Sequence, residues 1–144
     1  MPVLGIDLGR KRIGLAISDP SERVALPAGM IESRGRKADL AAIGSLARER
    51  GVKQIVVGLP LHMNGRAGPE AEAARAFAKA LALESGIPVE TLDERWSSVA
   101  AERTLRETGQ SGRKRKPGEA DTLAATLLLR TFLERRANQR DSSS

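Results

Sequence analysis

The opening stretch GIDLGRKRIGLAISD, residues 5–19, carries an acidic side chain inside an otherwise apolar strand. Alternation along residues 3–8 places Asp7 on the same face as Val3 and Gly5, while apolar side chains line the other face. That pattern is expected of a strand that is covered on both sides. An ionised carboxylate left unpaired in such a strand is costly, so Asp7 requires a cation, a metal ion or hydrogen-bond donors. A simpler alternative is that Asp7 only caps the turn at Gly9.

Hydrophobic periodicity and turn residues predict a mixed sheet flanked by helices. Strands are expected near residues 3–9, 12–18, 24–32, 54–58 and 87–92, and helices near 37–50, 69–85, 98–108 and 119–136. The first three strands are joined by connections too short for crossover helices, so they should be antiparallel, whereas the last two follow helices and should be parallel. The length of 144 residues fits one α/β domain over 1–137, followed by a flexible tail over 138–144.

The sequence has no cysteine and a single histidine, His62. Disulfides, thiolate zinc sites, iron–sulfur clusters, cysteine nucleophiles and multi-histidine metal sites are therefore excluded. Any bound metal must be held by carboxylate oxygens, which favours Mg²⁺ or Mn²⁺. The N-terminus lacks the features of a signal peptide, and no apolar run is long enough to cross a bilayer, so we expect a cytoplasmic protein without membrane contact.

Positive charge is concentrated in clusters, with 24 basic against 18 acidic residues and a net charge of +6. Such clusters favour a phosphate-binding surface, with an ordinary solvated surface as the alternative. Aromatic residues make up only 2%, so recognition should rely on the nucleic-acid backbone and shape rather than on a base-stacking platform. Glycine-rich residues 109–118 are expected to form a mobile basic loop on nucleic acid. The expected phosphate contacts are Lys11, Arg12, Arg95, Arg113, Lys114, Arg115 and Lys116.

Further carboxylates lie where they could converge with Asp7. Asp93 and Glu94 stand near the end of the last strand, and Asp121 stands in the first turn of the last helix, on its apolar side. Alternation places Asp93 and Glu94 on opposite faces, and the sequence alone leaves open which of them enters the site. Three converging carboxylates would repel one another unless divalent cations lay among them. Two ions about 4 Å apart are used in phosphodiester hydrolysis.

Four segments in this order resemble one known family. They are GIDLGRKRIGLAISD, VVGLPLHMNGRAGPEA, LDERWSS and GEADTLAATLLL, and they span residues 5 to 129. They are similar to the YqgF/RuvX family of RNase H-like Holliday junction resolvases, which are also described as pre-16S ribosomal RNA nucleases. The resemblance implies an RNase H-like fold, and metal-dependent hydrolysis by carboxylates that fall on Asp7, Glu94 and Asp121. It also implies Mg²⁺ or Mn²⁺ as the cofactor, with two ions expected.

The resemblance leaves the substrate open. Processing of the 5′ end of pre-16S ribosomal RNA is favoured, and ribosomal particles are then candidate partners. Resolution of branched DNA is the alternative, and it would need two active sites and hence a homodimer, whereas a monomer could trim RNA. A catalytically inactive nucleic-acid-binding module is the alternative of another class. Actin-like ATPases share the Asp-Leu-Gly turn, but they need two lobes and this chain supplies one.

Several other residues are predicted to have structural rather than catalytic roles. Asp19, before Pro20, is predicted to be a turn residue. Asp93 could pair with Arg95. Trp96, where the family usually has an aliphatic residue, is predicted to pack into the structure rather than to contact substrate. His62 and Asn64 replace an amide and an acid of the family pattern, and His62 is expected in a solvated loop.

Overall fold

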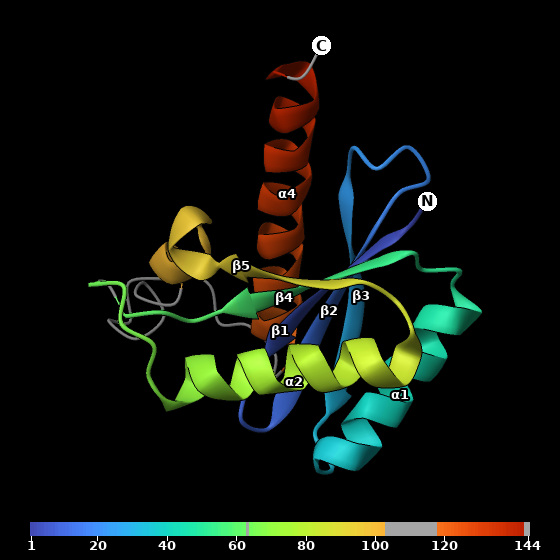
Figure 1. The fold of residues 1–144 in the computed structure, drawn as a ribbon, viewed down its shortest axis with the longest axis vertical. Coiled ribbons are helices and arrows are strands. Elements are labelled where there is room, and N and C mark those ends of the chain that lie inside the picture. Colours follow the sequence, from blue (N-terminus) through green and yellow to red (C-terminus); the bar gives the residue numbers. More distant parts are fainter. Residues whose placement is uncertain (63, 103–117, 143–144) are drawn as a thin grey trace.

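In a computed structural model, which describes residues 1–62, 64–102 and 118–142, the chain forms one five-stranded mixed sheet with helices on both faces (Figure 1). The strand order is β3-β2-β1-β4-β5. The strands are β1 (Val3–Leu8), β2 (Arg12–Ser18), β3 (Ala25–Glu32), β4 (Gln54–Leu59) and β5 (Val89–Asp93). The helices are α1 (Arg36–Glu49), α2 (Pro69–Ser85), the short 3₁₀ helix η1 (Glu94–Trp96) and α4 (Glu119–Ser142).

Strand β1 lies at the centre of the sheet. It pairs with β2 in antiparallel register, Asp7 opposite Gly14, and with β4 in parallel register, Ile6 beside Val57. β3 and β5 form the two edges. The predicted arrangement of three antiparallel strands followed by two parallel strands is confirmed, because the short connections and the intervening helices left no other simple pairing.

Two separate cores cover the two faces of the sheet. Helices α1 and α2 pack on the face formed by side chains such as Leu4, Ile6 and Ile55, and α4 packs on the opposite face against Val3 and Val56. Figure 1 shows α2 in front of the sheet and α4 crossing it from behind. β1 and β4 are thus buried on both sides, as their nearly continuous apolar sequences predicted.

Helix α4 extends further than the sequence predicted. It continues through residues 138–142, which we expected to belong to a flexible tail, so the predicted helix end at 136 is wrong. No glycine or proline lies between residues 119 and 142, and the polar residues after Leu133 are mostly good helix formers. The apolar periodicity stops at Leu133, beyond which α4 no longer packs on the core. The helix nevertheless continues, because the residues that follow have high helix propensity.

The segment after β5 is only partly described. β5 ends at Asp93, and Glu94 opens the 3₁₀ helix η1. Residues 99–102 are helical, and the remainder of the helix predicted near 98–108 lies outside the described residues. Within the described part of the chain, none of the helices combines the length and the apolar character needed to span a bilayer.

Candidate active site

Asp7 lies near the end of β1 on the face that α4 covers. Its side chain is only 2% exposed. Gly14 is its partner on β2, and a side chain at Gly14 would clash directly, because a Cβ built there would lie 1.9 Å from the Asp121 carbonyl oxygen. Glycine therefore allows the first turn of α4 to rest on β2 beside Asp7.

Asp121 projects from that first turn toward the β1–β2 turn. Its Oδ1 lies 3.5 Å from the position of a Cβ built at Gly9. The side chain is half-buried, and a carboxylate in the first turn is favoured by the positive end of the helix dipole. Asp121 is thus placed at the end of β1 that carries Asp7.

Glu94 approaches the same face from the other side of β1. It is 5% exposed, and its Oε1 lies 2.8 Å from a Cβ built at Gly58 of β4. Because Ile6 is level with Val57 in the parallel ladder, the next pair along brings Asp7 level with Gly58. A row of three residues therefore crosses the sheet, with Asp7 between Gly14 and Gly58.

The two glycines of this row leave room for the backbone of Asp121 and for the carboxylate of Glu94. Asp121 belongs to the segment that covers Gly14, and the Glu94 side chain lies over Gly58. Glu94, and not Asp93, lies on the face of Asp7, which favours Glu94 for the site; its role as a metal ligand stays a prediction. Nothing in the sequence had singled out Gly14 or Gly58, although glycines inside strands commonly mark the close approach of another group.

The donor chemistry of this site suits a hard divalent cation, since all three side chains offer anionic oxygen and two of them are buried. Within the described residues, however, no three side chains of the metal-ligating types are close enough together to hold an ion. Asp7, Glu94 and Asp121 are gathered at one end of the sheet without forming a ligand cluster. Asp7 and Glu94 each have an interaction with a neighbouring group.

Asp93 has a structural partner, as the sequence suggested. Its Oδ2 accepts a hydrogen bond of 2.6 Å from Nη2 of Arg95, and its Oδ1 accepts one of 2.9 Å from the Arg95 backbone N–H. The side-chain hydrogen bond from Arg95 is the main reason why the pKa of the Asp93 carboxyl is lowered, and the same pairing raises the pKa of Arg95. This ion pair anchors the start of η1 and therefore the backbone that carries Glu94.

The predicted phosphate-binding residues fall into three groups: two at the β1–β2 turn, one in an ion pair, and four outside the described residues. Lys11 is exposed and Arg12 half-buried at the β1–β2 turn, close in sequence to Asp7. Arg95 is engaged by Asp93, so its contact with phosphate stays a prediction. Arg113, Lys114, Arg115 and Lys116 lie outside the described residues, as does most of the predicted loop over 109–118.

Two further acidic residues have local structural roles. Asp19 accepts hydrogen bonds at its Oδ1 from the backbone N–H groups of Arg23 and Val24, both at 2.8 Å, and at its Oδ2 from the Ser21 hydroxyl. These bonds, led by that from Ser21, lower its pKa to about 2 and confirm the predicted turn residue. Asp39, which the sequence did not single out, is buried and accepts hydrogen bonds from Ser33 Oγ at 2.6 Å and from the Arg34 backbone.

Trp96 is the clearest error among the predictions for single residues. It is 55% exposed rather than packed into the structure, and the guanidinium carbon of Arg135 lies 4.0 Å from the centroid of its ring. The single tryptophan of the chain therefore lies at the surface, at the end of η1 and beside α4. His62 is exposed in the loop after β4, as expected.

The chain is similar to proteins of one known family. A family model described as "RuvX: Holliday junction resolvase" matches residues 1–135. The chain belongs to the RuvX family. A RuvX relative from Anaeromyxobacter dehalogenans strain 2CP-C is 48% identical over 137 residues, which cover 95% of this chain and 99% of that protein. Another relative, from Moorella thermoacetica, is 47% identical over 135 residues, which cover 94% of this chain and 96% of that protein. Both carry the provisional name pre-16S rRNA nuclease.

Solved structures show the same architecture at much lower sequence identity. RuvC of T. thermophilus, in complex with a Holliday junction substrate, superposes with a TM-score of 0.60 at 19% identity, covering 96% of both chains. The fowlpox virus resolvase, with Holliday junction DNA, gives 0.58 at 12% identity and covers 94% of this chain and 99% of its own. These likenesses confirm the expected RNase H-like fold of this RuvX protein.

Proposed function

We propose that this protein is a metal-dependent nuclease that hydrolyses phosphodiester bonds of structured nucleic acid, with the 5′ end of pre-16S ribosomal RNA as its first candidate substrate. The observation that carries the proposal is the row across the sheet, where Asp7 lies between two glycines whose missing side chains leave room for Glu94 and Asp121. Two buried acids at one end of the sheet beside a third are typical of a functional site.

The names of the relatives support the choice of RNA. Several RuvX proteins, 44–48% identical to this chain, carry the name pre-16S rRNA nuclease. The net charge of +6 is consistent with a polyanionic substrate.

In this proposal Asp7, Glu94 and Asp121 would hold Mg²⁺ or Mn²⁺ through their oxygens after drawing closer together, since within the described residues they form no ligand cluster. Metal held there would supply activation of a water molecule and stabilisation of charge on the leaving oxygen. Burial keeps Asp7 and Glu94 away from bulk water, which strengthens their interaction with a cation. The Asp93–Arg95 ion pair fixes the turn that presents Glu94, and Lys11 and Arg12 contact flanking phosphates. The products would carry a 5′ phosphate and a 3′ hydroxyl.

The experiment is a side-by-side cleavage assay on pre-16S RNA, single-stranded DNA and a four-way junction. Each substrate is incubated with Mg²⁺, with Mn²⁺ and with EDTA, and the cleavage ends are mapped. The proposal expects cleavage of the precursor RNA with either ion and none in EDTA. Undiminished cleavage in EDTA, or no cleavage of any substrate with metal, would contradict it.

Resolution of branched DNA is the second candidate function. It is favoured by the family description and by the shared fold of two resolvases solved with junction DNA. Symmetric resolution needs two active sites, so this function predicts a homodimer on the junction. Measuring the oligomeric state in the assay buffer separates the two: paired symmetric cuts by a dimer support resolution, and RNA cleavage by a monomer supports processing.

A further inference from the structure

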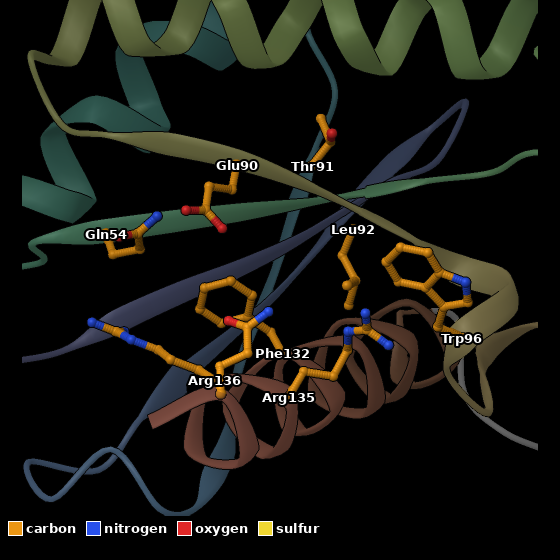
Figure 2. A pocket seen from close by; sticks show the side chains of 9 residues that line it. Gln54, Glu90, Thr91, Leu92, Trp96, Phe132, Arg135 and Arg136 are labelled. Carbon is orange, nitrogen blue, oxygen red and sulfur yellow. The ribbon is translucent and has the colours of Figure 1, made fainter. Parts of the chain in front are cut away.

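A groove lies between β5 and α4, beside the proposed active site but not part of it. It has a volume of about 510 Å³. Figure 2 shows Trp96 and Arg135 toward one end of the groove, Gln54 and Glu90 toward the other, and Leu92 between the two ends. Its remaining lining residues are Thr91, Phe132, Arg136 and Gln139. The volume falls within the usual range for sites that bind a small organic group.

We propose that this groove receives an unpaired nucleotide of the substrate strand, whose base stacks on Trp96 in the place that the Arg135 guanidinium occupies in the structure. The proposal rests on the proposed function, because it assumes a nucleic-acid substrate. It adds a single-stranded segment close to Glu94 as a feature that the substrate must have.

Trp96 is unusually exposed for a tryptophan. The residue is 55% exposed, which leaves a large apolar surface in water, and it lies in the same 3₁₀ helix as Glu94, two residues later. In this proposal a strand with a phosphate near Glu94 places a neighbouring nucleotide at the ring. Stacking on an aromatic side chain accepts any base, because every base has a π face.

The guanidinium of Arg135 already stacks on the ring, with its central carbon 4.0 Å from the ring centroid. An exposed cation–π pair is a weaker contact than a base stacked on an aromatic ring. A base can therefore replace the guanidinium, and the released cation can then pair with the phosphate of the same nucleotide. Arg136 is less suited to that exchange, because it forms an ion pair of 3.1 Å with Glu22.

The other end of the groove carries polar groups. The side-chain nitrogen Nε2 of Gln54 is buried and makes no hydrogen bond within the described part of the chain. Buried polar groups in native proteins are generally hydrogen-bonded, and a small rotation of the Gln54 side chain would let this donor meet an acceptor in the groove. Glu90 supplies an exposed acceptor at the same end of the groove. Donor and acceptor together match the polar edge of a base or a ribose hydroxyl.

The chain offers a direct reporter, because Trp96 is its single tryptophan. We propose to titrate the protein in EDTA with a short oligouridylate, with the matching oligothymidylate and with an RNA duplex of equal length. Trp96 fluorescence reports the groove, and the anisotropy of a labelled copy of each probe reports total binding. Saturable quenching by the single strands, at lower concentration than by the duplex, is the expected result. Similar affinities for the oligouridylate and the oligothymidylate would indicate a general single-strand site. Tighter binding of the oligouridylate would indicate that the site uses the ribose hydroxyl.

Variants test the two partners of the stack. Trp96→Ala should weaken oligouridylate binding about 5- to 100-fold, and Trp96→Phe should retain most of the affinity. Arg135→Ala should weaken binding several-fold and reduce its salt dependence, because one phosphate contact is lost. Arg130→Ala, which removes an exposed arginine of α4 that does not line the groove, is the matched control and should change neither.

Three outcomes would overturn the proposal: binding by anisotropy without a change in Trp96 fluorescence, no saturable binding of the single strands, or equal affinity of Trp96→Ala and wild type. The nuclease proposal is judged separately. If the wild type cleaves with metal but Trp96→Ala has an unchanged KM, only the groove proposal is contradicted. If quenching is saturable but no substrate is cleaved, only the nuclease proposal is contradicted.

Discussion

Gly14 lies directly opposite Asp7 across the β1–β2 ladder, and the backbone of α4 fills the space that a side chain at Gly14 would need. The proposed site therefore depends on a glycine as much as on its acids. The close approach brings Asp121 to the end of β1, where it joins Asp7.

Gly14→Ala tests this close approach. The added methyl group would lie 1.9 Å from the Asp121 carbonyl oxygen, and the backbone can relieve that contact only by moving α4. We expect the variant to lose about 1–3 kcal/mol or more of unfolding free energy, as overpacked cores do, and to lose cleavage activity as well. Urea unfolding measures the first effect.

Gly44→Ala is the matched control for that substitution. Gly44 lies inside α1, and an added Cβ would meet only the Arg48 side chain, at 3.6 Å. Alanine is favoured over glycine inside a helix by up to about 1 kcal/mol, so this variant should be slightly more stable than wild type. Equal stability of the Gly14 and Gly44 variants would contradict the described packing of α4.

Gly58→Ala should affect activity more than stability. Its added methyl group would lie 2.8 Å from Glu94 Oε1 and 3.1 Å from Leu128 Cδ2, and both are side-chain atoms that can shift, unlike the backbone that Gly14→Ala meets. We expect cleavage to fall at least about tenfold, since a displacement of about 1 Å at a catalytic group has large effects. The loss of unfolding free energy should be smaller than for Gly14→Ala. Unchanged cleavage kinetics would show that Glu94 does not act from its position over Gly58.

The sequence predicted the strand pairing and both faces of the central strands, because alternation and connection length are local signals. It could not choose between Asp93 and Glu94, since the strand ends between them and the alternation ends with it. The prediction that Trp96 packs into the structure was wrong, because large aromatic residues prefer the core only on average. Its exposure depends on how α4 crosses β5, which the local sequence does not encode. The role of Arg113 to Lys116 stays a prediction.

The Asp93–Arg95 ion pair predicts a specific pH dependence of stability. The pKa of Asp93 is lowered in the folded protein below its unfolded value near 3.9, so the pair stabilises the fold above about pH 4 and is lost as the pH falls below it. Asp93→Asn should therefore cost about 1–2 kcal/mol at pH 7 and less at pH 3. Urea unfolding at both pH values measures this difference, and a constant difference would contradict the assignment.

Glu72→Gln provides the control for that series. Glu72 pairs with Arg75 at 2.9 Å on the exposed surface of α2, where both side chains are largely in water. Exposed pairs contribute less than about 1 kcal/mol. Its removal should leave unfolding free energy nearly unchanged at both pH values, and a loss as large as that of Asp93→Asn would show that burial of the pair is not decisive.

The central claim is that Asp7, Glu94 and Asp121 act together on a divalent cation. The most direct measurement is the single-turnover cleavage rate of precursor RNA with Mn²⁺. It is made for the wild type, for the site variants Asp7→Asn, Glu94→Gln and Asp121→Asn, and for the control Glu72→Gln. Circular dichroism checks that each variant is folded. We expect each of the three site variants to lose at least about 100-fold in rate, as removal of one group that stabilises transition-state charge typically does, while the control keeps the wild-type rate. A folded Asp7→Asn protein that cleaves at the wild-type rate would contradict the account.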